Sequence, residues 1–169
     1  MPKYFVLFFL LNYHVIYSQS PISQYELEKK PVFTSLEKAV ANKEQVYKLN
    51  LSNQKLKEFP KEILLFENLQ ELNLGKNYIK EIPNEINRLK NLQLLNLSKN
   101  KIKKLPETFG DLKELQTLYL SKNRLIYFPN EMRGLDKLQF IDVSKNHLTY
   151  DELVFIKKIV PDNCEVLTK

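Results

Sequence analysis

Residues 92–102 read LQLLNLSKNKI, and this stretch decides the fold because the chain repeats it at a step of 23 residues. Closely similar copies occupy residues 69–79, 115–125 and 138–148. A degenerate first copy covers 46–56, with Gln54 where the other copies carry Asn. Since the copies follow one another without insertion or deletion, the sequence indicates a tandem array of one structural unit.

Each copy alternates apolar and polar residues, as in Leu72 and Leu74 with Glu71 and Asn73 beside them. This period of two predicts a short strand with one buried face, and stacked copies would place the strands side by side in a parallel sheet. The first four copies then continue with an apolar residue and a proline, at Phe59-Pro60, Ile82-Pro83, Leu105-Pro106 and Phe128-Pro129. Proline fixes φ and lacks an N–H, so these segments are predicted to start short helical or extended turns on the outer side.

The repeat resembles the leucine-rich-repeat family, whose pattern L-x-x-L-x-L-x-x-N-x-L recurs in units of 20–29 residues. The resemblance covers residues 46–148 directly, as five repeats starting at 46, 69, 92, 115 and 138. It implies an α/β solenoid: an arc with a parallel sheet on the concave face, short turns on the convex face and helical caps. The exact unit length resembles small exported bacterial members, which implies a non-enzymatic binding or adhesive scaffold directed at other proteins.

A column of asparagines follows the predicted strands: Asn77, Asn100, Asn123 and Asn146. At this point the chain turns and its backbone groups lose their partners in the sheet. An Asn side chain carries a donor and an acceptor and can satisfy such groups. We therefore predict a structural role for this column.

Open ends of a solenoid expose core residues and need polar caps. In the N-terminal segment 19–45, Thr34-Ser-Leu-Glu37 predicts a capping box for a short helix with Leu36, Ala39 and Val40 on its apolar face. In the C-terminal segment 149–169, Thr149 and Glu152 predict the start of a second helix. A further step of 23 predicts a last strand within 161–167 that turns Cys164 and Val166 inward, with the Cys164 thiol buried.

Residues 1–18 carry Lys3, an apolar run and a small residue, Ser18, and are predicted to be a secretory signal peptide cleaved after Ser18. The alternative is an uncleaved membrane anchor, which is the one case in which a membrane would be a partner. The formal net charge is +6, and loss of Lys3 leaves 6 − 1 = +5. This charge mildly favours anionic partners without identifying one.

Residues for catalysis, metal or cofactor binding are sparse. The chain has two histidines, His14 and His147, and one cysteine, so it lacks a cluster that would hold a transition metal. Its three glycines are scattered and form no phosphate-binding loop. Asp142, Ser144 and His147 stand in variable positions of a single repeat and are not a catalytic triad. We expect no catalytic residue, no cofactor and no enzymatic activity.

The outward-facing strand positions are the candidate ligand-binding residues of the concave face. They become apolar toward the C-terminal half, and the predicted patch consists of Leu94, Thr117, Tyr119, Phe140 and Asp142. Adjacent strands lie about 4.8 Å apart, so these side chains would be neighbours. Aromatic anchors of this kind are typical of protein interfaces, although strand propensity alone also favours Tyr, Phe and Thr.

A second column is basic and would form a stripe along the edge that follows the strands. Its members are Lys76, Lys99, Lys122 and Lys145, joined by Lys101 and Arg124. Solvated turn lysines explain such a stripe, but it could also bind a polyanion such as a polysaccharide or a lipid headgroup. The sequence shows no aromatic residues interleaved to stack bases, and nucleic acid is the least favoured partner for an exported chain. A third alternative is a structural surface component that associates with itself; we expect a monomer or weak self-association.

Overall fold

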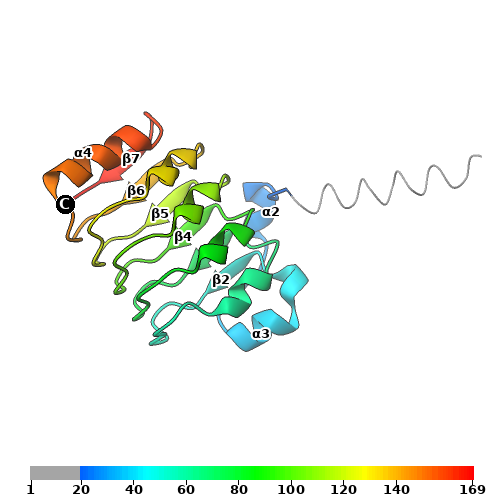
Figure 1. Cartoon of the computed structure of the whole chain (residues 1–169). Coiled ribbons are helices and arrows are strands. Elements are labelled where there is room, and N and C mark those ends of the chain that lie inside the picture. The colour runs from blue at the N-terminus through cyan, green and yellow to red at the C-terminus, as the bar shows by residue number, and fades with distance from the viewer. Residues whose placement is uncertain (1–19) are drawn as a thin grey trace, which may run out of the picture.

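The computed structural model describes residues 20–169. They form a parallel sheet of seven strands that follow one another in chain order, with short helices along the opposite face (Figure 1). The strands are β1 Val32–Phe33, β2 Lys48–Asn50, β3 Glu71–Asn73, β4 Leu94–Asn96, β5 Thr117–Tyr119, β6 Phe140–Asp142 and β7 Glu165–Leu167. From β2 to β6 each residue pairs with the residue 23 positions later, as Leu72 with Leu95. The predicted solenoid is confirmed.

The convex face is built from one 3-10 helix per coil, where a coil is one 23-residue repeat. These helices are η2 Lys61–Leu65, η3 Asn84–Arg88, η4 Glu107–Asp111 and η5 Asn130–Gly134. Each begins directly after a repeated proline whose backbone is extended. The central apolar residue of each helix, such as Phe109 in η4, is fully buried in the core. Gly110 lets η4 and η5 pack closely, because a Cβ there would collide with the carbonyl oxygen of Glu131.

The asparagine column joins each coil to the one before it. The Asn100 side-chain Nδ2 donates to the carbonyl oxygen of Leu97 in its own coil, at 3.0 Å, and to that of Leu74 in the preceding coil, at 2.9 Å. Its Oδ1 accepts from the backbone N–H of Ile79 at 3.0 Å. Asn77, Asn123 and Asn146 make equivalent bonds. The structural role predicted for this column is confirmed.

The N-terminal end carries two short α-helices. The predicted cap helix is α3, Leu36–Ala41, but its N-cap is Ser35 and not Thr34, since the Ser35 hydroxyl accepts from the Lys38 N–H at 3.3 Å. Ala39 is buried while Val40 is exposed, because consecutive helical residues point about 100° apart and only one of them faces the core. The 3-10 helix η1, Lys43–Gln45, then leads into the first coil.

A capping box does occur, in an earlier helix that the sequence reasoning missed. Helix α2, Gln24–Glu28, has Ser23 as its N-cap, whose hydroxyl accepts from the Glu26 N–H at 3.3 Å. The Glu26 carboxylate in return accepts from the Ser23 N–H at 3.1 Å. These hydrogen bonds from Ser23 hold the pKa of Glu26 below its usual value. Helix α2 thus has a defined start although it is only five residues long.

The C-terminal cap consists of α4, Tyr150–Ile159, followed by β7. The Thr149 hydroxyl accepts from the Glu152 N–H at 3.3 Å, which confirms the predicted start of α4. The predicted register of the last strand is wrong by two residues, because Val166 and not Cys164 pairs with Ile141. An α-helix rises about 1.5 Å per residue against about 2.0 Å in a 3-10 helix, so crossing the convex side with α4 takes more residues.

The predicted signal peptide at 1–18 lies outside the described residues. Between residues 20 and 169, the structure has no helix that is long and apolar enough to cross a bilayer.

Candidate functional site

The outward residues predicted as a patch lie together on three neighbouring strands. Leu94, Thr117 and Phe140 are paired in register across β4, β5 and β6, and Tyr119 pairs with Asp142. The rings of Tyr119 and Phe140 lie with their centroids 5.4 Å apart at an interplanar angle of 51°. This tilted arrangement is favourable for two aromatic rings. All five side chains are half-buried, so the patch is a shallow part of the concave surface and not a cavity.

The patch continues onto β7, which the sequence reasoning missed. Leu167 pairs with Asp142 and is 42% exposed, so it adds an apolar side chain at the C-terminal edge. The shifted register explains the omission, because a step of 23 would have placed Glu165, and not Leu167, beside Asp142. We refer below to Leu94, Thr117, Tyr119, Phe140, Asp142 and Leu167 as the concave patch.

Tyr119 departs from what its position does in the other coils. In those coils the position holds Asn50, Asn73, Asn96 or Asp142, and each of these side-chain oxygens accepts a backbone N–H two residues later, at 2.9–3.1 Å. This is a local turn that Asn and Asp favour. Tyrosine cannot make this bond, so coil 4 lacks it and presents an aromatic ring instead.

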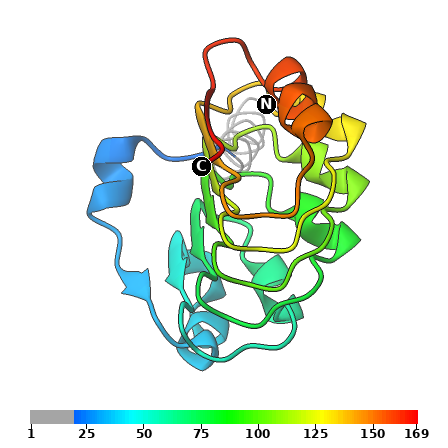
Figure 2. The same cartoon turned by 90° about the vertical axis from the view of Figure 1, so that its left-hand side faces the viewer.

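The N-terminal segment lies on the concave side of the sheet, away from the 3-10 helices (Figure 2). The Lys48 Nζ on β2 donates to the backbone carbonyl of Glu28 at 3.3 Å, and the Lys30 Nζ lies 4.6 Å from the centre of the Tyr47 ring. Leu27 of α2 is fully buried although it is outside the core cluster of the array. The segment therefore covers the concave surface next to β2, whereas the concave patch lies on the far strands.

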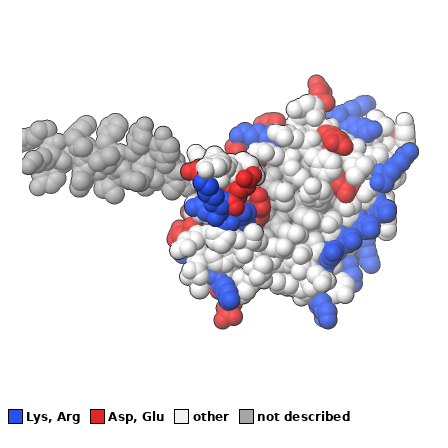
Figure 3. All heavy atoms as spheres, turned by 180° about the vertical axis from the view of Figure 1, so that it is seen from behind, with Lys and Arg blue, Asp and Glu red and all other residues white. Residues whose placement is uncertain are grey.

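The lysine column has a backbone explanation. Lys76, Lys99, Lys122 and Lys145 all have positive φ angles, between 54° and 57°. Their side chains are exposed, and the N–H groups of the first three donate to carbonyl oxygens of the next coil at 2.8–3.0 Å. Each is thus a left-handed turn residue, and its place in the repeat follows from the turn. Seen from behind, many basic side chains lie along the right-hand edge, others lie near the N-terminal side, and the middle of this face is mostly uncharged (Figure 3).

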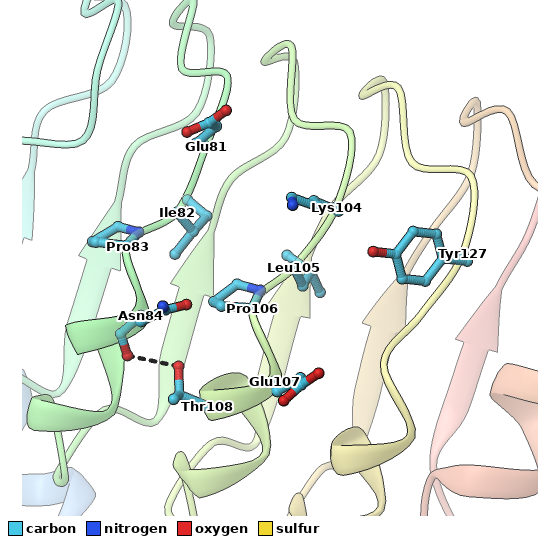
Figure 4. Close-up of a pocket in the computed structure, with 10 residues that line it drawn as sticks. All are labelled: Glu81, Ile82, Pro83, Asn84, Lys104, Leu105, Pro106, Glu107, Thr108 and Tyr127. Carbon is cyan, nitrogen blue, oxygen red and sulfur yellow. Dashed lines mark hydrogen bonds between the residues drawn. The ribbon is translucent and has the colours of Figure 1, made fainter.

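The two remaining basic residues of the predicted stripe, Lys101 and Arg124, lie beyond this turn on the flank of the array. There they line a groove with Lys80, Lys104 and Tyr127. A neighbouring hollow of about 550 Å3 shares Glu81, Lys104 and Tyr127, which come from three successive coils (Figure 4). Its lower wall includes Thr108, whose hydroxyl donates to the Asn84 carbonyl oxygen at 2.6 Å. The structure thus divides the predicted stripe into turn lysines and groove residues.

Chemically reactive groups are scarce in the part of the chain that the structure describes. It contains no group of three His, Cys, Asp or Glu side chains placed to hold a metal ion. Cys164 is half-buried, against the prediction of a buried thiol, because the shifted register moves it out of the core column. Burial, together with the neighbouring Glu165, raises its pKa from 9.0 to about 11. The thiol is therefore protonated and a poor nucleophile at neutral pH.

Comparison with known proteins agrees with this geometry. A family model described as leucine rich repeat matches residues 44–102 and 106–148, which is more than half of the chain. The chain belongs to the leucine-rich-repeat family. Members of this family are generally non-catalytic modules that are typically used for protein binding. No curated protein matches the chain by sequence.

Three solved structures illustrate the likeness. With a leucine-rich-repeat protein of Leptospira interrogans, the chain shares 37% identity over 73% of its own length and 33% of that chain, at a TM-score of 0.68. With a plant peptide hormone receptor, RGFR1 in complex with RGF2, the chain shares 34% identity over 65% of its own length and 18% of that chain, at a TM-score of 0.55. An internalin of Listeria monocytogenes is 19% identical over 79% of this chain and 37% of that one, with a TM-score of 0.60, and shows the fold alone. The chain thus spans between 18% and 37% of the length of these proteins.

Proposed function

We propose that this protein is an exported, non-enzymatic binding module that holds a protein ligand against the concave patch on β4 to β7. The observation that carries the proposal is the pair of half-buried rings, Tyr119 and Phe140, 5.4 Å apart on the neighbouring strands β5 and β6. Aromatic side chains that are clustered and can be desolvated dominate the binding energy of protein interfaces. The plant receptor in the comparison is a peptide hormone receptor in complex with RGF2.

The residue at position 119 supports a role in binding, because strand propensity alone does not account for a tyrosine there. Asparagine or aspartate at the same position forms a hydrogen bond with the following turn in the other four coils. The chain gives up that bond in coil 4 and gains an exposed ring beside Phe140. A loss of local stability in exchange for exposed aromatic surface is expected where the surface binds something.

The position of the N-terminal segment supports the proposed location of the binding site on the C-terminal strands. Because it occupies the concave side next to β2, the contact between Lys48 and Glu28 leaves a ligand less access to the first coils. The strands β4 to β6 carry the rings and the apolar residues. A ligand would therefore engage the C-terminal half of the arc.

Export is a separate part of the proposal and rests on the sequence of residues 1–18. We expect the intact mass of the protein recovered outside the cytoplasm to correspond to a chain that begins at Gln19. Recovery of the full chain in the membrane fraction would instead support the uncleaved anchor.

The binding test compares the whole chain with a Tyr119→Ala, Phe140→Ala double variant. Both would be used to capture proteins from extracellular material, and the captured protein would then be titrated by calorimetry. The inward residues Leu95, Leu118 and Ile141 carry the core, so the variant should keep the circular dichroism and melting of the parent. We expect it to lose at least about 2 kcal/mol of affinity, with mild dependence on salt.

A matched variant with Lys76, Lys99, Lys122 and Lys145 changed to Gln should bind the same protein almost as well as the parent. Binding that survives the aromatic changes and is abolished by the lysine changes would refute the proposal.

Sedimentation at increasing concentration separates a protein that binds another protein from one that associates with itself. Strong self-association that disappears in the double variant would assign the concave patch to a second copy of this chain.

A further inference from the structure

Three neighbouring coils form a basic groove on the flank of the array, between the turns that follow the strands and the 3-10 helices. We propose that this basic groove binds an acidic polysaccharide, independently of the concave patch. Its basic side chains are Lys80 from coil 2, Lys101, Lys103 and Lys104 from coil 3, and Arg124 from coil 4. The groove has a volume of about 490 Å3, which is in the range of pockets that hold small ligands.

The positive charge of the basic groove is only partly compensated by the protein. The ion pairs found among residues 20–169 involve Lys43, Lys113 and Lys137, none of which lines the groove. Glu81 is the one acidic side chain among the residues that line it. Several like charges that converge on a concave surface raise the local concentration of anions and steer them to that surface. A repeating anion could contact several of these cations at once.

The same groove exposes apolar surface. Ile126 is 54% exposed and Tyr127 is 40% exposed, and both line it beside Lys103 and Lys104. Neither residue belongs to the core or to a turn that requires it. The face of an aromatic ring carries partial negative charge and attracts weakly positive C–H groups that lie against it. A sugar ring that bears carboxylate or sulfate groups offers both such C–H groups and the negative charge that the lysines need.

The aromatic residues also argue against a nucleic acid strand. Tyr78 and Tyr127 both lie on this flank, so the sequence-based view that aromatics are absent near the basic residues was wrong. The Lys101 Nζ, however, lies 4.7 Å from the centre of the Tyr78 ring and covers one face of it. Proteins that bind single strands stack successive bases on several rings. Tyr127 is the one ring among the residues that line the groove, which suits a single sugar contact better than a row of bases.

The experiment titrates the whole chain with fluorescently labelled heparin, a sulfated chain, and with polygalacturonate, a carboxylated one. Neutral dextran and polyuridylate are tested in parallel. The groove variant carries Lys80→Gln, Lys103→Gln and Lys104→Gln, and the control variant carries Lys38→Gln, Lys90→Gln and Lys158→Gln, so both lose three charges. We expect the parent to bind at least one acidic polysaccharide and not dextran, the groove variant to raise Kd at least tenfold, and the control variant to raise it less than threefold.

A second variant, Tyr127→Ala, separates ring contact from charge. It should raise Kd severalfold while leaving the slope of log Kd against log salt concentration unchanged, whereas the groove variant should make that slope shallower. Equal losses in the groove and control variants would overturn the proposal, because they would show attraction by net charge alone. So would tighter binding of polyuridylate, or the absence of binding to both acidic polysaccharides at low salt. Tyr119→Ala with Phe140→Ala should leave polysaccharide binding intact, so this site and the concave patch can fail separately.

Discussion

In the middle of the array each coil closes its neighbour's turn through one asparagine, whereas the two ends use segments unrelated to the repeat. Asn100 bonds with backbone groups of its own coil and of the preceding coil. At the N-terminal end Gln54 replaces the asparagine, and its side chain donates to the carbonyl oxygen of Thr34 at 2.9 Å instead. At the C-terminal end α4 and β7 cover the last coil.

The difference shows that the inner coils and the two ends of a repeat array are stabilised by different kinds of contact. An inner coil has a neighbour on each side that offers the same backbone groups at the same places. The same residue type, asparagine, can therefore pair the turn's backbone groups in every coil. An end coil has a neighbour on one side only, and its exposed edge is covered by a flanking segment that does not belong to the repeat. We therefore expect the inner positions to respond alike to substitution and the ends to respond individually.

The largest effect is expected from removal of the C-terminal end. Truncation after Asn146 removes α4, with its buried Ile156 and Ile159, and leaves β6 as an unpaired edge. Such a chain should aggregate or bind a hydrophobic dye, because exposed apolar edges drive association. Dye fluorescence and sedimentation measure this. A soluble monomer with unchanged melting would show that 147–169 is a tail and not a cap.

The second effect concerns how firmly that end is docked, and Cys164 reports on it. Its pKa, raised by burial and by Glu165 from 9.0 to about 11, means that a smaller fraction of the thiol is ionised at pH 8 than in the unfolded chain. The two pKa values lower the thiolate fraction at pH 8 roughly a hundredfold in the folded protein. Because a thiolate with a higher pKa is more nucleophilic, the reaction with a disulfide reagent should be roughly tenfold slower in the folded protein than in urea. The rate should rise with pH up to about 11. Equal rates in the folded and unfolded protein would show that β7 does not stay docked.

The third prediction compares an inner asparagine with its counterpart at the end. Asn100→Ala leaves buried backbone groups of two coils without partners and should cost roughly 1–3 kcal/mol in the free energy of unfolding. Gln54→Ala loses one exposed hydrogen bond to Thr34 and should cost less than about 1 kcal/mol. Urea denaturation of both variants measures the difference. Similar costs would mean that the inner ladder has no special role.

The smallest effect is expected at the turn lysines. Lys99 has a φ of 56°, which glycine adopts more readily than any residue with a Cβ. Lys99→Gly should therefore stabilise the protein by up to about 1 kcal/mol, while Lys99→Ala should be close to neutral. Lys103 is not among the residues with positive φ, and Lys103→Gly serves as the control that should destabilise. Destabilisation by glycine at both positions would refute the turn explanation of the lysine column.

The repeat itself was predictable because its sequence pattern is short and recurs in every coil. One period of two residues defines each strand, one asparagine defines each turn, and a constant step of 23 defines the register from β2 to β6. The concave residues Leu94, Thr117, Tyr119, Phe140 and Asp142 could be placed for the same reason. Once the register is known, facing follows from alternation along the strand.

The ends were not predictable in this way because each occurs once. The two-residue shift of β7 depends on how α4 packs across the last coil, and it decides that Leu167 joins the concave patch. The position of α2 on the concave side depends on contacts such as that between Lys48 and Glu28, which are 20 residues apart in the chain.

The sequence by itself thus determined the solenoid, its register and the residues that face its concave sheet, since these follow from a period that any single coil displays. Only the tertiary structure decided which surfaces are open and which side chains meet on the flank. Lys80, Lys103 and Tyr127 have no shared motif in the sequence, and they line one groove because stacking brings successive coils side by side. Stacking converts a separation of about one repeat in the sequence into contact in space, and a site built across coils is visible only after the coils have been assembled.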